Sequence, residues 1–60
     1  MKEPGFYFAT LNSGVFEEHR DMVEVRTGAL RQFVYVMGIK DAVFRIEDFT
    51  DWSNQIKDQK

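Results

Sequence analysis

Residues 33–46 read FVYVMGIKDAVFRI and place two apolar runs on either side of the segment 38–41. Valine, tyrosine, phenylalanine and isoleucine favour β-strands, and Gly38 favours a turn. The pattern therefore predicts two strands, at about residues 33–37 and 42–47. The other elements are predicted outward from this apolar centre.

The same centre also has a helical spacing. Leu30, Phe33, Val34 and Met37 follow the i, i+3, i+4, i+7 pattern of a helix face. Periodicity alone does not assign so short an apolar run. A helix over residues 29–37 therefore stays open as the alternative, and it would make the centre of the chain mostly helical.

Two further strands are predicted towards the N-terminus. Residues 6–10 contain three aromatic residues and end in threonine, and both residue types are enriched in strands. Residues 22–27 carry Val23 and Val25 at alternate positions between charged side chains. The segment 11–14, LNSG, is the strongest turn signal in the chain. The residues between this turn and the second strand fit either a strand extension or a helical turn.

The C-terminal segment predicts a helix from about residue 49 to 58. Asp48 or Thr50 supplies an N-cap, and Asp51 places a carboxylate in the first turn. The apolar side chains form a stripe at i, i+3 and i+7, which consists of Phe49, Trp52 and Ile56. The expected fold class is therefore α+β: a small antiparallel sheet of three or four strands with this short C-terminal helix packed on it.

The length of 60 residues predicts a single small domain, residues 1–60, with residues 1–5 frayed. A domain of this size buries only about 60% of the surface that its unfolded chain exposes. The chain has no cysteine and one histidine, so disulfides are excluded and a structural zinc site lacks ligands. Its nine aromatic residues leave apolar surface for an interface. We therefore expect a homodimer.

The net charge of −2 gives no electrostatic attraction to phosphate backbones, which argues against nucleic acid as a partner. No stretch approaches the roughly 20 apolar residues of a membrane helix, and no secretory signal is visible. The expected location is the cytoplasm, with no membrane partner.

No motif identifies an enzyme. His19 is the only side chain that ordinarily titrates near neutral pH, and no nucleophile accompanies it. The four glycines are isolated, so there is no phosphate-binding loop. We expect no catalytic residue, no metal ligand and no cofactor.

The expected function is that of a non-catalytic protein–protein interaction module, a regulator that binds and modulates a larger protein. Small size, many aromatics and missing chemistry fit an inhibitor encoded by a phage or prophage. Tryptophan and tyrosine dominate binding hot spots. The expected contact residues are Tyr35 and Trp52, with a charged rim of Glu47, Asp48 and Asp51. Trp52 also has a structural interpretation, as the anchor of the predicted helix on the sheet.

An alternative function is nucleic-acid mimicry. Acidic residues lie in two stretches, which contain Glu17, Glu18, Asp21 and Glu24 in the first and Glu47, Asp48 and Asp51 in the second. On one face, these carboxylates would imitate phosphates and block a nucleic-acid-handling enzyme, although interspersed arginines weaken the field. Weak direct binding of nucleic acid by exposed aromatics such as Tyr7, Phe33 and Tyr35 is a further alternative.

Overall fold

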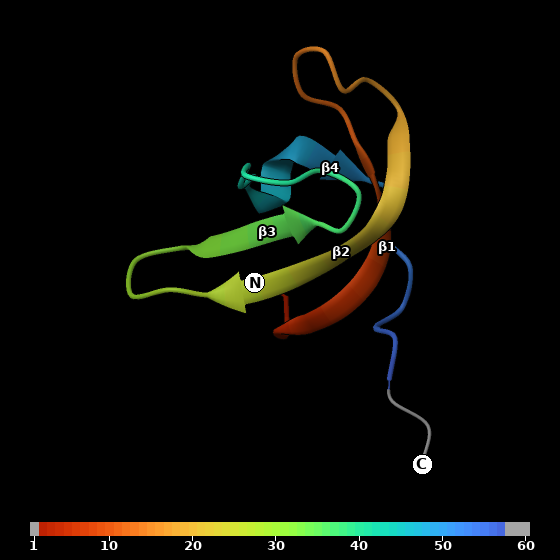
Figure 1. Ribbon diagram of the computed structural model, residues 1–60. Coiled ribbons are helices and arrows are strands. Elements are labelled where there is room, and N and C mark those ends of the chain that lie inside the picture. Colours follow the sequence, from red (N-terminus) through yellow and green to blue (C-terminus); the bar gives the residue numbers. More distant parts are fainter. Residues whose placement is uncertain (1, 58–60) are drawn as a thin grey trace.

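The computed structural model describes residues 2–57, which form a four-stranded antiparallel sheet of order β3-β2-β1-β4 that curls into a half-barrel (Figure 1). The strands are β1 (Gly5–Leu11), β2 (His19–Thr27), β3 (Gln32–Val36) and β4 (Phe49–Thr50). In this part of the chain, the helical structure is limited to η1, a three-residue 3₁₀ turn over Ile46–Asp48.

The core lies on the concave face of the sheet. The register sets Tyr7 opposite Val23 in the β1–β2 pair, and Val23 opposite Val36 in the β2–β3 pair. Because side chains alternate along a strand, every second residue points to this face. The buried set is Tyr7, Ala9, Leu11, Val23, Val25, Val34, Val36 and Phe49. Aliphatic side chains from three neighbouring strands therefore form one layer.

A chain of aromatic side chains covers that layer. Phe16 contacts Phe44 with ring centroids 6.0 Å apart, and Phe44 contacts Phe49 at 6.1 Å. Trp52 lies 5.4 Å from Phe49 and 5.5 Å from Tyr7. Three of these four contacts are edge-to-face, an arrangement that the ring quadrupoles favour. The loops are therefore held on the sheet by aromatic packing.

The predicted α+β class and the predicted C-terminal helix are wrong. After β4, the main chain runs alongside β1: the Ser53 N–H donates to the Phe8 carbonyl at 2.8 Å, and the Ile56 N–H to the Phe6 carbonyl at 2.7 Å. Asp51 has a left-handed φ of 55°, which a continuous helix does not allow. The free edge of β1 offers hydrogen-bond partners that a helix would leave unused. Residue 58 of the predicted helix lies outside the described residues.

The first three predicted strands, at residues 6–10, 22–27 and 33–37, correspond to β1, β2 and β3, although the ends of each strand differ. The alternative helix over residues 29–37 is therefore wrong. The predicted strand over residues 42–47 is also wrong, since only Phe44 forms a bridge, to Val34. The chain then turns into η1, where the Asp48 carboxylate accepts a hydrogen bond from the Arg45 N–H at 3.1 Å.

Lys2 and Glu3, which precede β1, contact the buried side chains of Gln32 and Tyr7. The Gln32 side chain accepts a hydrogen bond from the Lys2 N–H at 3.1 Å and donates to the Lys2 carbonyl and to Thr27 Oγ1. The Tyr7 hydroxyl donates to the Glu3 carbonyl at 2.6 Å. The Lys2 ammonium lies 4.5 Å from the centre of the Trp52 ring. The entry to β1 is thereby attached to the start of β3.

Candidate functional site

The chain's single histidine takes part in a structural contact. His19 Nε2 lies 3.3 Å from Asp21 Oδ2, and the Asp21 carboxylate also accepts hydrogen bonds from the Met22 N–H at 2.7 Å and the Gly38 N–H at 3.0 Å. These bonds tie the turn after β3 to β2. Within residues 2–57, no group of three histidine, aspartate or glutamate side chains is placed to hold a metal ion.

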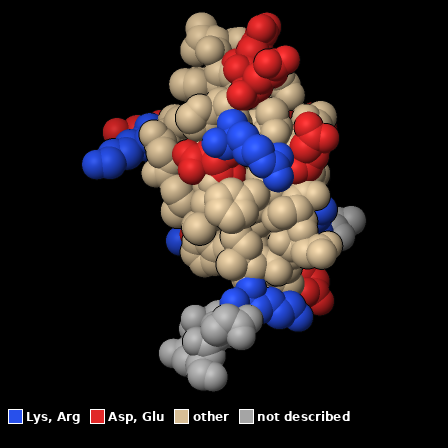
Figure 2. Space-filling model, turned by 90° about the vertical axis from the view of Figure 1, so that its right-hand side faces the viewer, with Lys and Arg blue, Asp and Glu red and all other residues tan. Residues whose placement is uncertain are grey.

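The convex face of the sheet carries exposed apolar side chains. We call them the outer patch, which consists of Phe6, Phe8, Tyr35, Met37 and Ile56, each 37% to 46% exposed. The register sets Phe8 opposite Met22 on β2, whose carbonyl accepts a hydrogen bond from the Met37 N–H, and it places Phe6 and Tyr35 on either side of Glu24. Figure 2 shows uncharged surface in the middle of this side of the molecule, with charged side chains above and below it.

Two arginines on β2 flank the outer patch, and both have intramolecular partners. Arg26 Nε lies 3.2 Å from Glu24 Oε2, and the guanidinium lies 5.0 Å from the centre of the Tyr35 ring. The hydrogen bond to Glu24 raises the pKa of Arg26. Arg20 donates to Thr10 Oγ1 at 2.9 Å and to the Asp51 carbonyl at 2.7 Å. The patch therefore contains the Glu24–Arg26 ion pair, and Arg20, hydrogen-bonded to two uncharged oxygens, lies at its border.

The five residues that the sequence predicted as partner contacts lie in different places. Tyr35 is in the outer patch, beside a shallow hollow of about 370 Å³ that Asp41, Ala42 and Val43 also line. Trp52 is half-buried on the aromatic chain over the core. Glu47 is exposed on η1, Asp48 caps that turn, and Asp51 is exposed after β4. The structure does not gather these residues into one surface.

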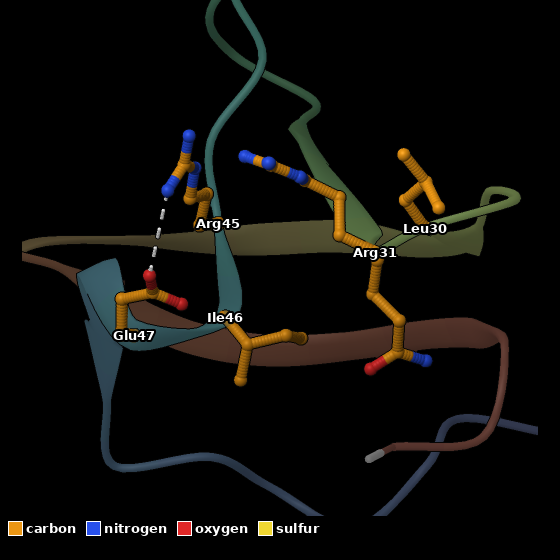
Figure 3. A pocket seen from close by; sticks show the side chains of 6 residues that line it. Leu30, Arg31, Arg45, Ile46 and Glu47 are labelled. Atoms are coloured by element: carbon orange, nitrogen blue, oxygen red, sulfur yellow. Dashed lines mark ion pairs between the residues drawn. The ribbon is translucent and has the colours of Figure 1, made fainter.

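A groove lies between the start of β3 and η1. It encloses about 520 Å³ and is lined by Leu30, Arg31, Gln32, Arg45, Ile46 and Glu47. In Figure 3 the Arg31 guanidinium extends towards the segment that carries Arg45, whose own guanidinium is joined to Glu47 by an ion pair. Arg45 Nη1 lies 4.0 Å from Glu47 Oε2, and both side chains are mostly exposed. Of these residues, sequence reasoning considered only Glu47 as a contact; no motif links the two arginines.

No helix in the described part of the chain is long and apolar enough to cross a membrane. Comparisons of the chain with protein-family models, with curated proteins and with solved structures find no match.

Proposed function

We propose that this protein is a non-catalytic interaction module of the cytoplasm that binds a larger protein through the outer patch. The observation that carries this proposal is the presence of five large, exposed apolar side chains on a single sheet face. The core uses the opposite face, so packing of the domain does not account for them. Contiguous apolar surface of this kind is typical of interaction sites.

The chemistry of the face supports a protein surface as the occupant. Phenylalanine, tyrosine and methionine are enriched at protein interfaces, where burial of apolar area favours association. Phe6, Phe8 and Tyr35 lie on strands, which fix their main chain, so little order has to be gained at these positions on binding. Glu24 compensates the charge of Arg26, whereas Arg20 bonds only to uncharged oxygens, so the matching partner surface combines apolar area with room for one positive charge.

Nucleic-acid mimicry receives less support from the geometry. The carboxylates of Asp21 and Asp48 accept hydrogen bonds from main-chain N–H groups, and Glu24 pairs with Arg26. Carboxylates committed in this way are poor substitutes for phosphates, because their charge is already shared with internal donors. The interaction module remains the better proposal.

The test compares two single substitutions that add the same charge. Phe8→Asp disrupts the middle of the outer patch, whereas Val15→Asp changes a side chain that is 90% exposed in the β1–β2 loop. Nuclease-treated lysate of the source cells is passed over each immobilised variant, and captured proteins are quantified by mass spectrometry. We expect a protein held by the wild type and by Val15→Asp to be lost from Phe8→Asp by roughly tenfold or more.

Two outcomes contradict the proposal. One is capture that Phe8→Asp and Met37→Asp leave unchanged, provided that circular dichroism shows both variants folded. The other is a homodimer in native mass spectrometry that Phe8→Asp dissociates, because the occupant of the outer patch would then be a second copy of the chain.

A further inference from the structure

The free edge of β3 has an interrupted ladder. Gly28 donates to the Arg31 carbonyl at 2.8 Å and Met37 to the Met22 carbonyl at 3.0 Å, so the odd-numbered residues of β3 bond towards β2. Val34 bonds on the side away from β2. Its N–H donates to the Phe44 carbonyl at 2.9 Å, and its carbonyl accepts from the Phe44 N–H at 2.8 Å. Since main-chain groups alternate in an antiparallel pair, those of Gln32 point to the same free edge.

The groove is the place where this second pairing stops. Continued antiparallel pairing would set Ile46 opposite Gln32, but Ile46 begins η1 and the chain turns away. The space that opens between them is the 520 Å³ groove. An unpaired strand edge is a template for an added strand. An extended peptide could pair there with the main-chain groups of Gln32, in the place that Ile46 leaves beside β3.

Charge identifies the chemistry of that peptide. Arg31 and Arg45 both line this groove (Figure 3). The ion pair between Arg45 and Glu47 is at the limit of contact, 4.0 Å, and is exposed. Two like charges that line one groove are stabilised by an anion bound there, and the guanidinium fork matches a carboxylate. Leu30 and Ile46 add apolar contact on either side of this charge.

We infer that the groove between β3 and η1 binds an extended peptide segment that carries a carboxylate side chain. A peptide is favoured over a nucleic acid because the strand edge offers main-chain hydrogen bonds that an added strand can use. The net charge of −2 also supplies no wider basic frame. This inference concerns a different surface from the outer patch and does not depend on it.

The experiment uses the full chain, labelled with ¹⁵N, and two capped hexapeptides of alternating valine and threonine. One peptide has a central glutamate and the other a glutamine at that position. We expect the glutamate peptide to shift the Gln32 amide resonance and to bind roughly tenfold or more tightly than the glutamine peptide. Arg31→Gln and Arg45→Gln should each weaken binding by a similar factor.

Lys40→Gln is the matched control, because it removes one positive charge from the exposed turn after β3, which does not line the groove. Equal binding of both peptides, or equal loss in Lys40→Gln and the arginine variants, overturns the inference. Tighter, salt-sensitive binding of a single-stranded oligonucleotide at the Gln32 amide also overturns it. Phe8→Asp should leave peptide binding unchanged, so this inference and the proposed function fail separately.

Discussion

Two leucines show how far position decides the role of a residue in this chain. Leu11 is fully buried between the strands, whereas Leu30 is 93% exposed at the entry to β3. We expect Leu11→Ala to lower the free energy of unfolding by about 2–5 kcal/mol, because it leaves a cavity in the core. Leu30→Ala should change it by less than about 0.5 kcal/mol. Urea unfolding followed by circular dichroism measures both, and equal effects would contradict the described core.

Trp52 has a structural role that its sequence context left open. Its ring packs between Tyr7 and Phe49 and holds the C-terminal segment against the sheet. We expect Trp52→Ala to lower the free energy of unfolding by about 2–4 kcal/mol, somewhat below the range for a fully buried tryptophan. Trp52→Phe should recover part of that loss. A fully stable Trp52→Ala variant that loses a partner would instead identify Trp52 as a contact residue.

At the scale of elements, local patterns predicted the strands and misassigned the connections. Val23 and Val25 alternate with charged residues, and this period of two is a local property that the structure confirms as β2. The spacing of Phe49, Trp52 and Ile56 fits a helix equally well. What decides against the helix is the free edge of β1, which is formed by residues more than forty positions earlier in the chain. No window of sequence contains that information.

For the candidate surfaces too, local sequence predicted some features, whereas others depend on contacts between distant parts of the chain. Tyr35 was predictable as an exposed aromatic because it lies on a strand between two buried valines. The presence of Arg31 and Arg45 in one groove could not be predicted, because the bridge between Val34 and Phe44 is what brings their segments together. Long-range register, which composition does not specify, therefore creates the groove.

The hairpin of β2 and β3 supplies a prediction at this scale. The Asp21 carboxylate accepts main-chain hydrogen bonds at Met22 and Gly38, and so closes the far end of the hairpin. Asp21→Ala should lower the free energy of unfolding by about 1–3 kcal/mol, because it leaves these donors without their acceptor. It should also speed hydrogen exchange at the Gly38 amide. Glu17→Ala, an exposed loop substitution, is the control; equal exchange rates in both variants would contradict this role.

At the scale of the whole molecule, a single layer of eight buried hydrophobic residues stabilises the described chain. Domains of this size rarely exceed about 3–5 kcal/mol of stability. We expect one cooperative transition, since the C-terminal segment shares aromatic packing with β1 and β4. Fluorescence of Trp52, the single tryptophan, and far-UV circular dichroism should therefore give the same urea midpoint. An earlier fluorescence transition would show that residues 51–57 detach from a folded sheet.

The alternation along β1 has a consequence for how the protein can evolve. Tyr7, Ala9 and Leu11 are buried, while Phe6 and Phe8, on either side of Tyr7 in sequence, face outward. Variation at the inward positions is expected to reduce cellular abundance, and variation at the outward positions to change partner choice at unchanged abundance. A saturation library over residues 6–11 should thus separate the two phenotypes with a period of two. On the proposed function, partner specificity would change along this strand without loss of the fold.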